Sequence, residues 1–324
     1  MHSFKELHRQ IESALEQETF SGVPQELYDS INYVVNLGGK RLRPVLCLMG
    51  CELFDGNLNT AMKQAMGLEL FHNFTLVHDD LMDQADLRRG KYTVHKKWDP
   101  ERAILAGDLL HVISNQYMMI VSNDILREVL ELYHYSAIKV CEGQQMDMDF
   151  ENSGQVNLND YMQMIELKTA TLFAASLKMG AVLAKAYDQN SKRIYEFGRN
   201  MGLAFQIQDD YLDTFGDSNK FGKTIGGDIV ANKKTYPLLK AYEAADQQEH
   251  QQLNRLMNDD QMAHEAKISQ VKALFIDLGV KESTERKRDE YYREAQANLA
   301  EIQAEDAKKE PLMDLCAYIM KRES

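Results

Sequence analysis

Two clusters of aspartates with the same spacing are the residues of this sequence best suited to chemistry. One is Asp79-Asp80-Leu81-Met82-Asp83 and the other is Asp209-Asp210-Tyr211-Leu212-Asp213. In a helix, the first and fifth positions of each cluster lie on one face about one turn apart, so their carboxylates can point at a shared ion. Mg²⁺ takes such oxygen ligands and is typically completed by water and substrate phosphates. The candidate metal ligands are therefore Asp79, Asp80, Asp83, Asp209, Asp210 and Asp213.

The simpler interpretation is that these aspartates decorate exposed helix ends. The side chains around both clusters argue against it, because Leu76 and Val77 precede the first and Phe205 and Ile207 precede the second. Carboxylates on apolar helices are costly unless they are paired or bind a metal. The pattern favours metal sites.

Basic residues accompany both clusters in the sequence. They are Lys40, Arg41 and Arg43 after a Gly-Gly pair, Arg88 and Arg89 after the first cluster, and Lys168, Lys223 and Lys233 further along. Backbone amides at a glycine turn and guanidinium groups both bind phosphate. Each cation alone is typical of a solvated surface. Together with two metal-binding clusters they predict a site for phosphorylated substrates, with room for two diphosphates.

The elements that position these groups are predicted to be helices, because strand signals are scarce and apolar residues recur at helical spacing. The predicted segments are Thr60–Asp83, Glu101–Val121, Ile125–Met148, Leu158–Ala184, Ser191–Phe215, Lys234–Ala245, Gln248–Leu278 and Thr284–Ile302. Turn residues at 55–57 and 151–154 separate some of them, and the glycine-rich stretch 215–228 predicts a long functional loop. No linker interrupts residues 1–324, so we expect one all-α domain.

Composition excludes several classes of protein. The chain has 37 Lys and Arg against 50 Asp and Glu, a net charge of −13, which argues against a nucleic-acid-binding protein. No block of about 18 apolar residues is present, so no membrane span is expected. The first residues mix charged and apolar side chains, unlike a secretory signal. We therefore expect a cytoplasmic protein.

In its motifs the chain resembles the trans-isoprenyl diphosphate synthases, also called polyprenyl synthetases. The matching stretches are GGKRLRP (38–44), LVHDDLMDQADLRRG (76–90), KTA (168–170), FQIQDDYLD (205–213) and GKTIGGDIVANKKT (222–235). They occur in the family's order, and the joint match is far more specific than any one motif. The sequence departs from the usual family motifs in two small ways. Tyr92 stands where proline is common, and Ala231-Asn232 replaces an acidic residue followed by glycine.

The resemblance implies a homodimer of the isoprenoid synthase fold, with about ten to thirteen helices around a central cavity and the aspartate motifs on opposing walls. Three Mg²⁺ ions, with Mn²⁺ as a substitute, would join Asp79, Asp83 and Asp209 to an allylic diphosphate, which is dimethylallyl, geranyl or farnesyl diphosphate. Further ligands of that diphosphate would be Arg88, Lys168, Lys223 and Lys233. Isopentenyl diphosphate would bind Lys40, Arg43, His72 and Arg89. Thr169 and Gln206 would lie near the reacting carbons, and Asp228 would help place the lysine loop.

The same resemblance implies a transferase that lengthens an allylic diphosphate by five carbons per condensation. Phe74 lies five residues before Asp79, roughly 7.5 Å along a helix, where family members carry bulky residues that stop chain growth, and its neighbour Thr75 is small. One aromatic residue there resembles geranylgeranyl diphosphate synthases, so C20 is favoured, C15 farnesyl diphosphate comes next, and long chains come last.

Two other functions are consistent with parts of this pattern. A class I terpene cyclase shares the fold and the first motif, but its second metal site usually mixes Asn, Ser or Thr, and Glu, whereas a second DDxxD is present here. A regulatory subunit of a synthase heteromer should have lost aspartates or basic residues, and this chain retains them. Both alternatives rank below prenyl transfer.

Overall fold

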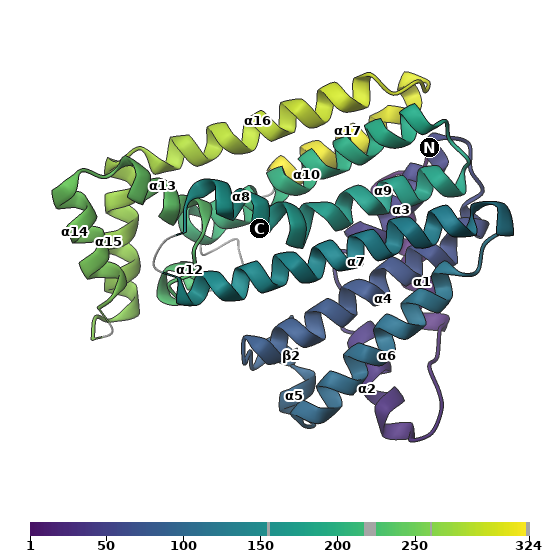
Figure 1. Ribbon diagram of the computed structural model, residues 1–324, viewed down its shortest axis with the longest axis horizontal. Coiled ribbons are helices and arrows are strands. Elements are labelled where there is room, and N and C mark those ends of the chain that lie inside the picture. The colour runs from purple at the N-terminus through teal and green to yellow at the C-terminus, as the bar shows by residue number, and fades with distance from the viewer. Residues whose placement is uncertain (154–155, 217–224, 260, 322–324) are drawn as a thin grey trace. The chain divides into compact units, whose positions relative to one another are not determined.

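The computed structural model describes residues 1–153, 156–216, 225–259 and 261–321, and its regular structure is overwhelmingly helical (Figure 1). The helices are α1 (Phe4–Gln17), α2 (Gln25–Val35), α3 (Leu42–Leu53), α4 (Leu58–Met82), α5 (Val94–Lys97), α6 (Pro100–Met118), α7 (Asn123–Asn152), α8 (Leu158–Ile165), the π-helical turn η1 (Glu166–Ala170), α9 (Thr171–Leu183), α10 (Asp188–Phe215), α12 (Gly227–Val230), α13 (Tyr236–Ala244), α14 (Gln247–Met257), α15 (His264–Asp277), α16 (Val280–Ala300) and α17 (Asp306–Lys321). Strands in the described ranges form one antiparallel hairpin, β1 (Leu87–Arg88) and β2 (Lys91–Tyr92). The predicted all-α class is confirmed.

Two long predicted helices are each divided in the structure. The segment 158–184 is interrupted by η1. The segment 248–278 becomes α14 and α15, because the Asp259 carboxylate accepts the backbone N–H groups of Gln261 (2.9 Å) and Met262 (3.0 Å) and so bends the chain. The turn predicted at 151–154 begins after Asn152, because α7 continues to that residue. Most of the predicted loop 215–228, residues 217–224, lies outside the described residues.

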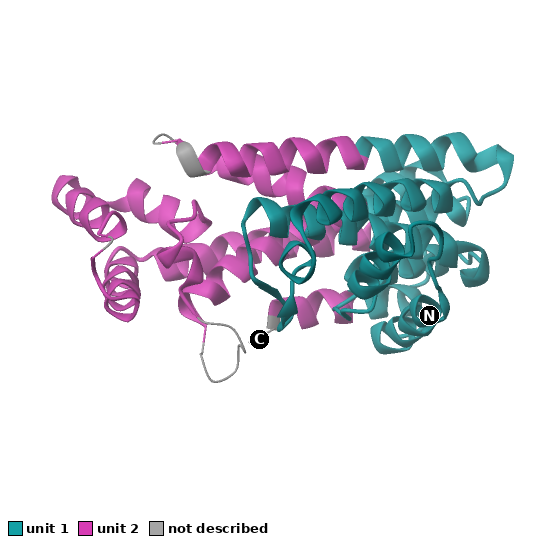
Figure 2. Ribbon diagram, turned by 90° about the horizontal axis from the view of Figure 1, so that it is seen from below, with its two compact units in different colours: residues 1–135, 175–195, 302–312 teal, residues 136–174, 196–301, 313–324 magenta. Residues whose placement is uncertain are grey.

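The chain divides into two compact units, which Figure 2 colours separately. Unit 1 comprises residues 1–135, 175–195 and 302–312, and unit 2 comprises residues 136–174, 196–301 and 313–324. Four of the five boundaries fall inside α7, α9, α10 and α17, and the fifth falls between α16 and α17. The single domain expected from the sequence stays a prediction.

Unit 1 is organised around α4, which packs against α3 and α6. Close approach of α4 and α6 depends on Gly67, where a Cβ atom would lie 2.7 Å from Cε of Met118. The first half of α4 is buried on most sides, from Ala61 to Phe71, whereas its last turn, which carries the first aspartate cluster, is partly exposed. The buried part of the helix therefore holds the cluster rigidly at its end.

Unit 2 buries one face of α10 against α8 and α13. The cluster includes Ile165, Leu203, Ile207, Tyr236 and Leu239. At Gly202 the π-helical turn comes very close, since a Cβ there would lie 2.7 Å from Cα of Ala170. This packing places η1 beside the part of α10 that leads into the second aspartate cluster. None of the described helices is both long and apolar enough to cross a lipid bilayer.

Candidate active site

The first aspartate cluster lies at the C-terminal end of α4 in unit 1. The backbone N–H of Asp83 donates to the Asp79 carbonyl at 2.8 Å, so the two residues are one helical turn apart. Asp79 is partly exposed and Asp83 is exposed. In the described part of the chain, no three His, Cys, Asp or Glu side chains are grouped as a ready-made metal site. Two carboxylates on adjacent turns nevertheless fit Mg²⁺, which binds through one or two carboxylates together with water and phosphate.

Asp80, between them, points elsewhere. Its side chain is buried, and Nε of Arg88 donates to its two carboxylate oxygens at 2.8 and 2.7 Å, while Nη2 of Arg88 lies 2.6 Å from Oδ1. A guanidinium group matched to a carboxylate in this way has a fixed orientation. The geometry favours Asp80 as the residue that aims Arg88, and it favours Asp79 and Asp83 as the ligands of a metal.

The β1–β2 hairpin sets the position of Arg89. Arg89 (φ 54°) and Gly90 (φ 75°) form its two-residue turn, and two positive φ values are typical of a type I′ turn. The Arg89 guanidinium lies against Gly39 in the loop before α3, where a Cβ atom would approach its Nη2 to 2.6 Å. A side chain at Gly39 would therefore displace the Arg89 guanidinium, and the contact brings two predicted diphosphate-binding segments together.

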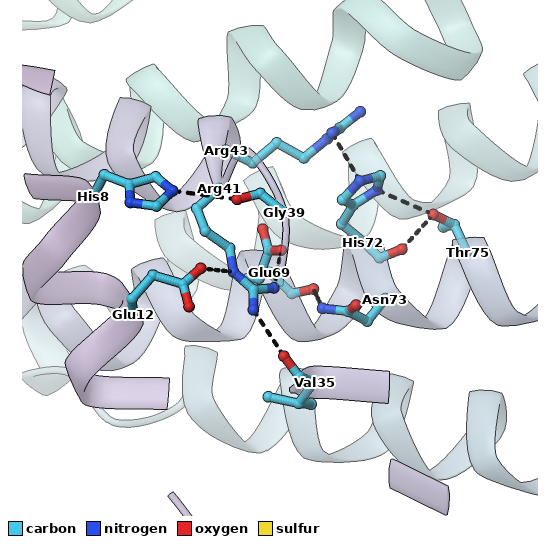
Figure 3. Close-up of polar contacts among 10 residues, drawn as sticks. All are labelled: His8, Glu12, Val35, Gly39, Arg41, Arg43, Glu69, His72, Asn73 and Thr75. Atoms are coloured by element: carbon cyan, nitrogen blue, oxygen red, sulfur yellow. Dashed lines mark hydrogen bonds and ion pairs between the residues drawn. The ribbon is translucent and has the colours of Figure 1, made fainter. Parts of the chain in front are cut away.

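His72 and Arg43 form a polar pair inside unit 1 (Figure 3). Nη1 of Arg43 lies 3.0 Å from Nε2 of His72, and burial together with the arginines around it holds the His72 pKa well below its usual value. The ring is therefore neutral, and Nε2 accepts the hydrogen bond from Arg43. Burial also lowers the Arg43 pKa, to about 10, which leaves its guanidinium charged at neutral pH.

Four arginines act on His72 electrostatically, namely Arg43, Arg89, Arg88 and Arg41. Lys40, in the same loop, is exposed. The structure thus brings the predicted isopentenyl diphosphate ligands Arg43, His72 and Arg89 together within unit 1. A concentration of guanidinium charge around a neutral imidazole is a natural anion site.

Phe74 is enclosed by other rings on α4 and α6. It stacks on His111 with centroids 5.0 Å apart and an interplanar angle of 14°, and it makes edge or tilted contacts with His78 (4.9 Å) and Phe71 (5.5 Å). Thr75 lies beside the polar pair instead, because its hydroxyl is 3.5 Å from Nδ1 of His72; it also donates to the His72 carbonyl at 2.8 Å. Of the two predicted chain-length residues, Phe74 is the one that belongs to an aromatic cluster.

The second aspartate cluster lies at the C-terminal end of α10 in unit 2. Asp209 and Asp213 are partly exposed and one turn apart, as in the first cluster. Asp213 also organises the chain that follows, because its carboxylate accepts the Asp228 backbone N–H at 3.1 Å and its carbonyl accepts that of Gly226 at 2.7 Å. Asp228 in turn accepts the Lys233 backbone N–H through its carbonyl at 2.9 Å.

Asp210 is a buried hydrogen-bond acceptor. It accepts the Tyr161 hydroxyl, the Tyr236 backbone N–H at 3.0 Å and Nε2 of Gln206 at 3.1 Å. Burial raises the Asp210 pKa to about 7. Since Gln206 gives its amide hydrogens to Asp210, its carbonyl accepts the Thr169 hydroxyl at 3.1 Å. The structure therefore links Thr169, Gln206 and Asp210 in one chain of hydrogen bonds, and the expected place of Thr169 and Gln206 near the reacting carbons stays a prediction.

The lysines of unit 2 have different surroundings. Lys168 lies in η1, a type of helical irregularity that often marks functional sites, and its Nζ pairs with Asp147 at 2.6 Å. Lys233 is exposed in the loop before α13. Lys223 lies outside the described residues, so its predicted role stays a prediction.

Sequence reasoning missed several partners of these residues. Arg41 is buried, unlike its exposed neighbour Lys40, and it pairs with Glu12 and Glu69. Asp147 pairs with Lys168, and Asp210 accepts a hydrogen bond from Tyr161. All are distant in sequence from the residues they contact. The one signal available was Glu69, a carboxylate between Leu68 and Leu70 on a helix predicted to be buried.

Known proteins match this chain along most of its length. The sequence model of the polyprenyl synthetase family matches residues 24–275. The geranylgeranyl diphosphate synthase of Methanosarcina mazei is 40% identical over 222 residues, 68% of each chain. The short chain isoprenyl diphosphate synthase of Methanothermobacter thermautotrophicus is 34% identical over 311 residues, 95% of this chain and 94% of that one. A crystal structure of a geranylgeranyl pyrophosphate synthase superposes with a TM-score of 0.95 at 39% identity, covering 100% of both chains. The chain is a member of the polyprenyl synthetase family.

Proposed function

We propose that this protein is a Mg²⁺-dependent prenyltransferase that condenses isopentenyl diphosphate with allylic diphosphates to give geranylgeranyl diphosphate. The observation that carries the proposal is the group of arginines around neutral His72, immediately preceding the first aspartate cluster on α4. The positive charge of these arginines can bind a diphosphate without a metal ion. The names of the relatives and the family match support the same reaction class.

Each diphosphate has its own set of proposed ligands. Isopentenyl diphosphate binds Lys40, Arg43, His72 and Arg89. The allylic diphosphate binds Arg88, Lys168, Lys223 and Lys233, together with Mg²⁺ held by Asp79, Asp83, Asp209 and Asp213. Mg²⁺, when bound, neutralises the diphosphate and makes it a better leaving group. Asp80 keeps the Arg88 fork aimed at that diphosphate.

The proposed reaction needs no nucleophile from the protein. The allylic carbon–oxygen bond breaks, and its electron pair leaves with the diphosphate, whose charge Arg88 and Lys168 stabilise. The double bond of isopentenyl diphosphate then attacks the allylic carbon. A proton lost from the adjacent carbon passes to the released diphosphate and restores a double bond. Asp210 holds the Gln206 amide, and Gln206 in turn accepts the Thr169 hydroxyl. The hydrogen bonds fix the orientation of both side chains beside the reacting carbons.

The proposed product length rests on Phe74. Its ring is held between His111, His78 and Phe71, so it cannot move aside easily for a growing chain. The C20 product follows from this obstruction and from the relatives that are named geranylgeranyl diphosphate synthases, with C15 as the second expectation.

We also propose that the protein is a homodimer. On α6 and its C-cap residue, the exposed side chains of Ile104, Leu105, Val112 and Met119 fall within one face about 100° wide, which also carries the charged Glu101 and Asp108. Exposed apolar side chains that gather on one side of a helix often mark an interface. The expected cytoplasmic location stays a prediction.

The test of the reaction is an incubation of purified protein with isopentenyl diphosphate and each of dimethylallyl, geranyl and farnesyl diphosphate, with Mg²⁺ or with EDTA. The expected result by mass spectrometry is a C20 diphosphate that forms only with Mg²⁺. Absence of elongation with all three primers would overturn the proposal. Hydrocarbon release without consumption of isopentenyl diphosphate would identify a cyclase, and activity only after addition of a second subunit would identify a regulatory chain.

A further inference from the structure

Arg41, the last residue of the loop 38–41 before α3, is buried in unit 1 (Figure 3). Its Nε donates to Glu12 of α1 at 2.7 Å, its Nη1 to Glu69 of α4 at 2.7 Å, and its Nη2 to the Val35 carbonyl of α2 at 2.7 Å. Three helices thus contact one guanidinium group. Burial opposes the Arg41 charge, but Glu69 and Glu12 outweigh it and raise the Arg41 pKa above its usual value.

The loop that Arg41 anchors has an unusual backbone. Gly38 (φ 76°), Gly39 (φ 146°) and Arg41 (φ 45°) all have positive φ, and for arginine this region is unfavourable. A second contact, from Nε2 of His8 to the Gly39 carbonyl at 3.2 Å, also comes from α1. The conformation therefore depends on tertiary contacts, because the local sequence does not favour it.

This backbone sets the direction of three side chains of the proposed isopentenyl diphosphate site. Lys40 precedes Arg41, Arg43 follows two residues later, and the Arg89 guanidinium rests against Gly39. A change in the backbone at Arg41 would move all three together. Rigid placement of binding groups by supporting contacts is what such sites require.

We propose that Glu12 and Glu69 are positioning residues that act through Arg41 to shape the isopentenyl diphosphate site. The inference rests on the proposed function, since it assigns a role within that site. Neither carboxylate touches the substrate. Each holds the guanidinium group that keeps the loop in its diphosphate-binding conformation.

Positioning and simple electrostatics predict opposite results, which makes the inference testable. Replacement of Glu12 or Glu69 by glutamine removes a negative charge close to the arginines, and Coulomb's law alone predicts tighter diphosphate binding. If the carboxylates position the loop, binding becomes weaker. Arg41→Lys keeps the charge, so electrostatics predicts unchanged binding, whereas loss of the fork that joins two carboxylates and a carbonyl predicts weaker binding.

The experiment measures equilibrium binding of labelled isopentenyl diphosphate in EDTA, followed by KM for isopentenyl diphosphate and for farnesyl diphosphate with Mg²⁺. Glu12→Gln, Glu69→Gln and Arg41→Lys are each expected to raise the isopentenyl diphosphate Kd and KM about tenfold, the effect of losing one charged hydrogen bond. KM for farnesyl diphosphate should stay within about twofold. Glu12 is 26% exposed, so its variant stays informative if the buried Glu69 variant folds poorly.

Glu18→Gln is the matched control. The Glu18 side chain is 27% exposed and pairs with Lys63 at 2.7 Å, so it resembles Glu12 in burial and pairing but does not contact the loop. It should lower stability without changing either KM. Unchanged or tighter isopentenyl diphosphate binding by Glu12→Gln and Arg41→Lys would overturn the inference alone. A wild-type protein that binds no isopentenyl diphosphate would overturn the proposed function and the inference with it.

Discussion

At the scale of single residues, the central aspartate of each DDxxD cluster differs from its neighbours. Asp80 is bound by Arg88 and Asp210 by Tyr161, Tyr236 and Gln206. A carboxylate whose lone pairs are already occupied by donors is a poor ligand for an incoming ion. We therefore expect Asp80 and Asp210 to act mainly on these donors and to contribute less to metal binding than the sequence alone predicts.

Asp80→Asn should accordingly behave differently from Asp79→Asn. Loss of the Asp80 charge releases Arg88, so KM for the allylic diphosphate should rise about tenfold, and more Mg²⁺ should not restore it. Asp79→Asn should weaken metal binding, so part of its lost activity should return at high Mg²⁺. Initial rates over a Mg²⁺ titration separate the two. Recovery of Asp80→Asn with Mg²⁺ would show that Asp80 is a metal ligand after all.

Gly39→Ala tests the contact between the loop before α3 and Arg89. A methyl group there would lie 2.6 Å from Nη2 of Arg89, in a backbone conformation that already disfavours alanine. We expect KM for isopentenyl diphosphate to rise at least about tenfold, with KM for the allylic substrate retained. Gly38→Ala is the control, because φ is also positive there but no atom lies within 4 Å of the added carbon. Equal effects of the two variants would mean that backbone strain alone is responsible.

His72 should make stability depend on pH in a defined direction. Burial and the nearby arginines lower its pKa in the folded protein, whereas the unfolded chain takes up a proton near pH 6.5. Below that pH the unfolded state binds more protons, so the His72 contribution to the free energy of unfolding falls as pH falls. Urea unfolding of wild type and His72→Gln at pH 7.5 and 5.5 measures this. The wild type should lose about 1 kcal/mol more than the variant over this interval, and equal losses would contradict the prediction.

At the scale of elements, α4 connects the two parts of the site in unit 1. Its buried first half fixes the helix, and its last three turns carry His72, Phe74 and the first aspartate cluster in succession. A helix keeps these groups at constant spacing because each residue advances about 1.5 Å. The hairpin β1–β2, which follows α4, places the Arg88 guanidinium on Asp80 and the Arg89 guanidinium beside Gly39.

Phe74→Ala tests the role of α4 in product length. The substitution removes the ring that stacks on His111 and leaves space beside the helix. The expected products by mass spectrometry are longer than C20, with total incorporation of isopentenyl diphosphate within about threefold of wild type. Products of unchanged length at normal incorporation would show that another element stops chain growth.

At the scale of the whole molecule, the exposed apolar side chains of α6 predict association of two copies. Val112→Asp adds a charge among these side chains and should convert the dimer to a monomer in sedimentation velocity at micromolar concentration. Tyr187→Asp is the control, since Tyr187 is 81% exposed but lies outside the face. A wild-type protein that sediments as a monomer, or a Val112→Asp variant that stays dimeric, would contradict the prediction.

Much of the fold and the candidate site could be predicted from the sequence because the signals are local. Helical spacing of apolar residues gave most helices, and DDxxD spacing placed carboxylates on one helix face. The prediction of one continuous helix over 158–184 was incomplete: the π-helical turn at 166–170 packs against Gly202 and Gly143, which are distant in sequence. The split of 248–278 depends on a side-chain turn at Asp259 that competes with helix formation.

The sequence by itself determined the helical class, the two acidic clusters, the basic motifs and the family, since each depends on residue type and short spacing. The tertiary structure alone decided that Arg41 turns inward to Glu12 and Glu69, that Asp80 binds Arg88, and that Asp210 fixes Gln206. The physical reason is that a charged side chain looks the same in sequence whether it binds a ligand or another side chain. Which of the two it does depends on burial and on partners supplied by other elements, often tens of residues away.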